Sequence, residues 1–150
     1  MTEGLGTKTI VQVGLVVRDI ETSIDNYVRI FGLTERPQAR ETETPDVTNI
    51  QYRGETTQGR AKLAFINMGQ VTIELIEPIG GPSTWQEFLD AHGEGVHHIA
   101  FNVKGTPQVV SFLNGQGIPV VQRGDYTGGM YTYLDAAPKL GVILELLENF

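Results

Sequence analysis

The sequence contains no cysteine, and this absence excludes several classes of protein. Without thiols the chain cannot form disulfides, use a cysteine nucleophile or build a zinc site from cysteine pairs. Any metal site must therefore use His, Asp, Glu or Gln side chains. No apolar run approaches the roughly 20 residues of a membrane-spanning helix, and residues 1–9 lack the basic start and apolar core of a signal peptide. We expect a cytoplasmic protein that does not enter a membrane.

Positive charge is also scarce. The chain has 11 Lys and Arg residues against 18 Asp and Glu, which gives a net charge of −7, and the basic residues are scattered along it. Nucleic acids and anionic membranes are therefore poor partners, and a small-molecule substrate is expected instead. The length of 150 residues and the hydrophobic content of 40% are typical of a globular protein with a substantial core.

The order of predicted elements repeats itself along the chain. In the first half, residues 10–18 predict a strand and residues 19–32 a helix, with Asp19 as its N-cap and Gly32 at its end. Three further strands are expected at residues 47–53, 61–68 and 70–76. In the second half a strand, a helix beginning at Thr106 and three strands follow in the same order; the four strands are expected at residues 95–103, 120–123, 130–134 and 142–147.

The repeat predicts an α+β protein made of two paired βαβββ modules. Each module is too small to bury both faces of its own sheet, so we expect one domain over residues 1–150. Its parts are a first module at about residues 8–78, a connector with a short helix at residues 84–91, and a second module at about residues 95–150. The two modules are expected to form a curled, cup-shaped mixed sheet with the helices on the outside.

Four polar side chains interrupt apolar strands at equivalent places of the two modules. Because side chains alternate across a strand, Gln12 and His98 face away from the helices of their modules. Glu74 and Glu145 each stand among aliphatic neighbours in the last strand of their module. A buried carboxylate costs several kcal/mol unless it is paired or binds a cation. We therefore predict that Gln12, Glu74, His98 and Glu145 hold one divalent metal, with Zn²⁺, Ni²⁺, Co²⁺, Mn²⁺ and Fe²⁺ all compatible.

Other interpretations of these residues remain open. A single Gln or His on a strand is more often a hydrogen-bonded core residue, which is the role expected for His97. Glu74 and Glu145 could also lie on a solvent-facing surface of the sheet.

The paired modules, the strand GVHHIAFNV and the closing strand GVILELLE resemble the vicinal oxygen chelate superfamily. This superfamily includes glyoxalase I, methylmalonyl-CoA epimerase, extradiol dioxygenases and the fosfomycin and bleomycin resistance proteins. The resemblance extends from about Ile10 to Glu148. It implies the same four metal ligands, a metal that chelates two adjacent substrate oxygens, and an enediolate or enolate formed there.

The ligand set Gln, Glu, His, Glu is similar to that of zinc glyoxalase I. The positions that bind glutathione in that enzyme are not matched, because they hold Val16, Pro78 and Glu94 here. The additional catalytic glutamate of the epimerases is not matched either, since residues 63–66 are apolar. We therefore expect a metal-dependent isomerase or lyase of the glyoxalase or epimerase type, with Glu145 as the first candidate base and Glu74 as the second. The alternative is a small-molecule-binding protein of the resistance type.

Five further residues are candidates for substrate binding. Arg53 and Arg60 lie in a long polar segment and could bind a carboxylate or phosphate, although a solvated loop is the simpler interpretation. Asn102 shares the strand face of His98. Tyr131 and Tyr133 lie on a strand that leads toward Glu145, where they could line a pocket or pack across a hairpin.

A homodimer is expected, because a half-cup leaves sheet edges unpaired and a twofold dimer can cover them. The segments proposed for the interface are residues 7–9 and the apolar residues 118–121.

Overall fold

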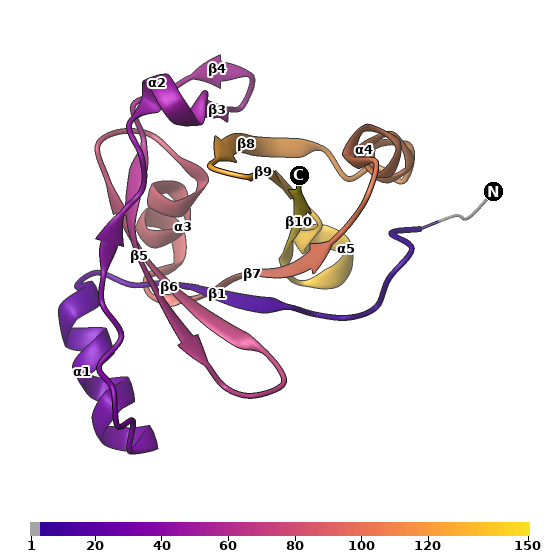
Figure 1. Cartoon of the computed structure of the whole chain (residues 1–150). Helices are drawn as coiled ribbons and strands as arrows, with labels where there is room; N and C mark the ends of the chain where they lie inside the picture. The colour runs from indigo at the N-terminus through magenta and orange to yellow at the C-terminus, as the bar shows by residue number, and fades with distance from the viewer. Residues whose placement is uncertain (1–3) are drawn as a thin grey trace.

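The strands of residues 4–150, the part of the chain that the computed structural model describes, form one mixed sheet (Figure 1). The elements in chain order are β1 Gln12–Val16, α1 Ile20–Phe31, β2 Arg40–Glu41, α2 Pro45–Thr48, β3 Gln51–Tyr52, β4 Glu55–Thr56, β5 Arg60–Asn67, β6 Thr72–Ile79, α3 Thr84–His92, β7 Gly95–Asn102, α4 Thr106–Gly115, β8 Val120–Tyr126, β9 Gly129–Leu134, α5 Ala137–Leu140 and β10 Ile143–Asn149. The α+β class expected from the sequence is confirmed.

The order of strands in the sheet is β2-β5-β6-β1-β7-β10-β9-β8-β3-β4. The first strand of each half pairs in parallel with the last strand of the same half, β1 with β6 and β7 with β10. The halves join through the antiparallel pair β1 and β7. The sheet curls, so that β8 lies across from β1 and β7 rather than extending away from them (Figure 1). The two halves predicted from the repeated order of elements therefore have the same strand pairing in the sheet.

The helices pack on the sheet through the apolar positions that the sequence spacing indicated. In the first half, Ile20 and Ile24 of α1 are buried against Leu75 of β6. In the second half, Val109 and Leu113 of α4 are buried against residues of β10. These contacts fix the outer face of each half, and the polar strand residues lie on the opposite face.

The segment between α1 and β5 differs from the expected strand at residues 47–53. Pro45 begins the short helix α2, and Asn49 ends it in a left-handed conformation with a φ of 46°. Only Gln51 and Tyr52 form a strand, and they pair with β8 of the other half. The prediction was wrong because this strand depends on a distant partner and not on its own alternation of residues. As a result, a segment of the first half extends the sheet edge of the second.

The structure also bears on the expected absence of a membrane-spanning helix and on the proposed dimer interface. None of the helices within residues 4–150 is long and apolar enough to cross a membrane. Of the apolar segment proposed for a dimer interface, Ile118 and Val121 are buried in the core of the chain itself. The homodimer stays a prediction.

Candidate metal centre

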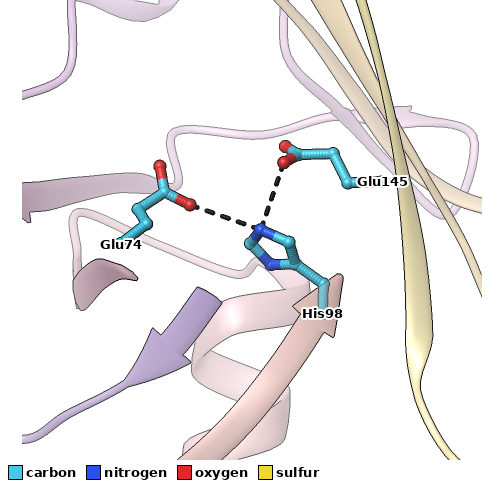
Figure 2. Close-up of side chains that lie close together, drawn as sticks. All are labelled: Glu74, His98 and Glu145. Atoms are coloured by element: carbon cyan, nitrogen blue, oxygen red, sulfur yellow. Dashed lines mark ion pairs between the residues drawn. The ribbon is translucent and has the colours of Figure 1, made fainter. Parts of the chain in front are cut away.

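Three of the four predicted ligands meet within one chain. The Nε2 atom of His98 lies 3.3 Å from Oε1 of Glu74 and 3.1 Å from Oε1 of Glu145. The ligand atoms of these residues all lie within 4.8 Å of one another, and all three residues are buried. Figure 2 shows the two carboxylates approaching the same ring nitrogen from different sides, one from β6 and one from β10.

Gly14 allows this convergence. It stands in register with Glu74 on β6 and with His98 on β7, at the junction of the two halves. A β-carbon on Gly14 would lie 2.0 Å from Cε1 of His98, so the imidazole ring occupies the space that a side chain would need. The glycine is therefore required by the position of the histidine ring.

The donor atoms lack the hydrogen bonds that buried polar atoms normally have. Oε1 of Glu74, Nε2 of His98 and Oε1 of Glu145 are each inaccessible to solvent and have no hydrogen-bond partner among the described residues. The distances to His98 are those of an ion pair, but the orientations fall outside hydrogen-bond geometry. A cation at the centre of the three atoms would satisfy all of them, and one nitrogen with two carboxylate oxygens suits a transition metal.

The electrostatics of the cluster agree with this. Burial raises the pKa of the Glu74 carboxyl, and the charge of Glu145 raises it further. Burial alone would lower the pKa of His98, but the charges of Glu145 and Glu74 outweigh it and raise that pKa to about 10. The surroundings thus favour a positive charge between the two carboxylates.

His97 contacts His98 on the side of the ring away from the two carboxylates, through Nδ1. Its Nδ1 lies 2.9 Å from Nδ1 of His98, and its Nε2 lies 3.2 Å from the hydroxyl of Thr84 at the start of α3. Burial lowers its pKa well below the usual range, and the neighbouring His98 adds to this effect. The expected role of His97 as a hydrogen-bonded core histidine is consistent with this placement.

A cavity of about 610 Å³ opens beside the cluster. Gln12, Glu74 and Glu145 line it, and so do three of the residues predicted to bind substrate, namely Asn102, Tyr131 and Tyr133. Its remaining walls combine aliphatic and aromatic residues with the acidic side chains of Glu41, Glu43 and Asp125. The size is that of an ordinary small-molecule site.

The two arginines predicted to meet a substrate are engaged elsewhere. Arg53 forms a two-pronged ion pair with Glu87, at 2.7 Å for the closer contact, and lies outside the cavity wall. Arg60 pairs with Glu41 at 3.2 Å and donates to the carbonyl of Thr42. A substrate contact by either arginine would require one of these interactions to open.

Sequence reasoning missed the residues that hold the tyrosines. Trp85 Nε1 lies 3.1 Å from the hydroxyl of Tyr133, and Gln122 Nε2 lies 3.1 Å from that of Tyr131. Burial raises the pKa of both tyrosines, so both hydroxyls keep their protons. The only signal for Gln122 was a polar residue directly after the two valines that open the expected strand at residues 120–123.

Comparison with known proteins agrees with the fold. The chain is 27% identical over 139 residues to the uncharacterized protein YqjC of Bacillus subtilis, covering 91% of this chain and 89% of that protein. It is 23% identical over 149 residues to a mitochondrial methylmalonyl-CoA epimerase of Dictyostelium discoideum, covering 97% and 81%. The crystal structure of methylmalonyl-CoA epimerase from Mycobacterium tuberculosis has the same fold, with a TM-score of 0.64 at 22% identity over 100% of this chain and 93% of that one. Residues 11–133 match the sequence profile of the glyoxalase/bleomycin resistance protein/dioxygenase superfamily, and the chain belongs to this superfamily.

Proposed function

We propose that the chain is a metal-dependent isomerase that moves a proton at a carbon next to a carbonyl group. Glu74, His98 and Glu145 would hold one divalent metal, and Gln12 on the cavity wall would supply a fourth ligand. The observation that carries the proposal is the convergence of three buried donor atoms that lack hydrogen-bond partners. Structural packing alone gives no reason to leave such atoms unsatisfied.

The histidine pair prepares the ligand. To bind a cation through Nε2, His98 must carry its proton on Nδ1, which lies 2.9 Å from Nδ1 of His97. His97 then accepts that hydrogen bond and carries its own proton on Nε2, facing the hydroxyl of Thr84. This chain of hydrogen bonds fixes both tautomers, which is how outer residues commonly orient a metal-binding histidine.

When bound, a divalent metal acts as a Lewis acid that makes a C–H bond next to a carbonyl easier to deprotonate. The side chains of the protein carry the proton. Glu145 would accept it from one face of the substrate, and Glu74 would serve the opposite face. Both carboxylates line the cavity, so either can face a bound molecule.

Isomerisation of an acyl thioester fits better than glutathione chemistry. Relatives in sequence and in structure bear the name methylmalonyl-CoA epimerase. Of the positions that would bind glutathione, Val16 is fully buried, and the carboxylate of Glu94 accepts a hydrogen bond from the backbone of Arg18. Methylmalonyl-CoA is therefore the first compound to test.

The test combines metal content with isotope exchange. Protein purified without chelator should hold one equivalent of transition metal per chain, and in D₂O it should exchange the proton next to the thioester of methylmalonyl-CoA. Loss of exchange on chelation and recovery on adding metal are expected. A chain that holds no metal but still binds small molecules in the cavity would favour the alternative of a binding protein of the resistance type. A metal-loaded chain that is inactive on this compound would support the metal site but rule out methylmalonyl-CoA as the substrate.

A further inference from the structure

The rings of Tyr131 and Tyr133 lie side by side on the cavity wall, and the hydrogen bonds of their hydroxyls have a fixed direction. The two residues are two positions apart on β9 and so lie on the same face of the strand, with ring centroids 5.1 Å apart. Both line the cavity beside Glu145. Each hydroxyl has one proton to donate and can accept through its oxygen. If the oxygen of a hydroxyl already accepts a hydrogen bond from the protein, its proton remains available to donate to a ligand.

For Tyr133 the direction follows from Trp85. The indole Nε1 can only donate, and it lies 3.1 Å from the Tyr133 hydroxyl. The Tyr133 oxygen therefore accepts this bond, and its own proton is left over.

For Tyr131 the direction follows from a backbone amide two steps away. The N–H of Thr84 donates to Oε1 of Gln122 at 2.8 Å, which fixes the orientation of the Gln122 side-chain amide. Its Nε2 group must then donate to the Tyr131 hydroxyl at 3.1 Å. The Tyr131 oxygen accepts, and again the proton is left over.

Neither proton finds an acceptor within residues 4–150, since the only hydrogen bonds that these two hydroxyls make are the ones they accept. Leaving a buried donor without an acceptor costs free energy. We propose that Tyr131 and Tyr133 form a paired hydrogen-bond donor site for a negatively charged or strongly polarised oxygen of the cavity ligand. This inference rests on the proposed function, in which such an oxygen lies close to the carboxylates and His98. The two donors would favour the state in which negative charge develops on that oxygen.

Tyr126 provides a matched control on the same cavity wall. Its hydroxyl donates to Oδ1 of Asn149 at 2.6 Å, so its proton is already committed. Replacing Tyr126 by Phe removes a cavity hydroxyl but no free donor.

The experiment measures binding, so it does not depend on knowing the substrate. Co²⁺-loaded wild type, Tyr131→Phe, Tyr133→Phe and Tyr126→Phe proteins are titrated with acetohydroxamate, which presents two adjacent oxygens and carries a negative charge when it binds a metal. A hydrogen bond to a charged oxygen is strong enough that its loss should weaken binding about 10-fold or more. Tyr131→Phe and Tyr133→Phe should each show this loss, while Tyr126→Phe should stay within about 2-fold of wild type. Co²⁺ affinity should be the same in all four proteins.

The outcomes separate the two proposals. Normal Co²⁺ uptake with equal acetohydroxamate affinity in wild type, Tyr131→Phe and Tyr133→Phe overturns the donor pair and leaves the metal site intact. A loss of equal size in Tyr126→Phe also overturns it, because the effect would then follow from any change in the wall. Failure of the wild type to take up Co²⁺ overturns the proposed function and the donor pair together. If one variant does not fold, the other still tests its own hydroxyl.

Discussion

The two halves of the sheet share one architecture but present different chemistry to the cavity. Phe65 stands opposite Glu74 in the first half, at the place that Tyr133 occupies opposite Glu145 in the second. Two residues along, Leu63 of the first half corresponds in the same way to Tyr131. At these two positions the first half therefore supplies apolar side chains to the cavity and the second half supplies hydroxyls. A ligand in this cavity meets two unlike sides, although the carboxylates are placed symmetrically.

The first strands differ in a related way. The register of the sheet makes Gln12 the counterpart of His98 and Gly14 the counterpart of Ala100. The second half provides the large ligand, and the first half provides the empty space into which it fits. The two halves thus share one backbone arrangement, but one contributes the histidine and the other contributes the glycine that makes room for it.

The largest expected effect separates the two carboxylates. With the substrate enantiomer whose proton Glu145 accepts, Glu145→Gln should lower the rate of isotope exchange about 10²- to 10⁴-fold, the usual contribution of a general base. Glu74→Gln should keep exchange on one face of the substrate within about 10-fold of wild type while losing inversion, because the first base remains. The measurement is deuterium incorporation by NMR alongside a chiral assay of the product, with metal content as the control. Equal loss of exchange in both variants would contradict the proposed division of roles.

The second effect concerns Gly14. Gly14→Ala places a methyl group where the imidazole of His98 now lies, so the ring must move away from the two carboxylates. We expect metal affinity to fall about 100-fold or more, because the geometry of a ligand set is lost with one ligand displaced. Ala100→Gly is the matched change in the other half, and it should leave metal affinity within a few fold, since it introduces no atom that could displace a ligand. Calorimetric titration with Zn²⁺ measures both. Near-normal Zn²⁺ affinity in Gly14→Ala would mean that His98 is not a ligand.

A third and smaller effect tests the support of the histidine. His97→Leu removes the acceptor for the Nδ1 proton of His98 and should lower metal affinity about 10- to 100-fold, as is typical when an outer partner of a ligand is lost. Val11 occupies the equivalent place before Gln12, and Val11→Leu should have little effect. Zn²⁺ titration together with the ¹⁵N chemical shifts of His98 would show whether its tautomer changes. Unchanged affinity and shifts would reduce His97 to a packing residue.

Sequence reasoning predicted the elements whose information is local. Helix α1 was predicted with its ends because Asp19 and Gly32 act on their immediate neighbours. The Glu74, His98 and Glu145 cluster was predicted because the repeat aligned these residues. The short strand β3 was not predicted, and neither were the roles of Gln122 and Trp85. Each of them depends on a partner more than 30 residues away in the sequence; Thr84 and Gln122, for example, are 38 residues apart. No spacing within the chain marks such contacts.

The smallest effect compares how the two halves begin their helices. Helix α1 has its own cap, since the Asp19 carboxylate accepts from the backbone N–H groups of Glu21 and Thr22. Helix α4 has Gly105 at its N-cap and no side-chain cap of its own, and Glu148 of β10 takes this role from a distance. Its two carboxylate oxygens accept from the backbone N–H groups of Gly105 and Thr106 and from the Thr106 hydroxyl. Both helices are thus bonded to the closing strand of their half, α4 through three hydrogen bonds to Glu148 and α1 through one, from the backbone N–H of Ile20 to Oε1 of Glu77 on β6 at 2.9 Å.

These bonds lower the pKa of Glu148, with the side-chain bond from Thr106 as the largest cause. A carboxylate whose pKa is lower in the folded than in the unfolded state stabilises the fold above its unfolded pKa of about 4.3, and this contribution is lost as pH falls below that value. Glu148→Gln should therefore lower the melting temperature at neutral pH, because one amide group cannot accept from all three donors, and the difference from wild type should shrink below about pH 4. Asp19→Asn is the matched change in the first half and should cost less, because Asn caps helices about as well as Asp. Thermal melts of the three proteins from neutral pH to about pH 3.5 measure both differences. A Glu148→Gln deficit that stays constant over this range would show that the charge of Glu148 is not what holds the start of α4.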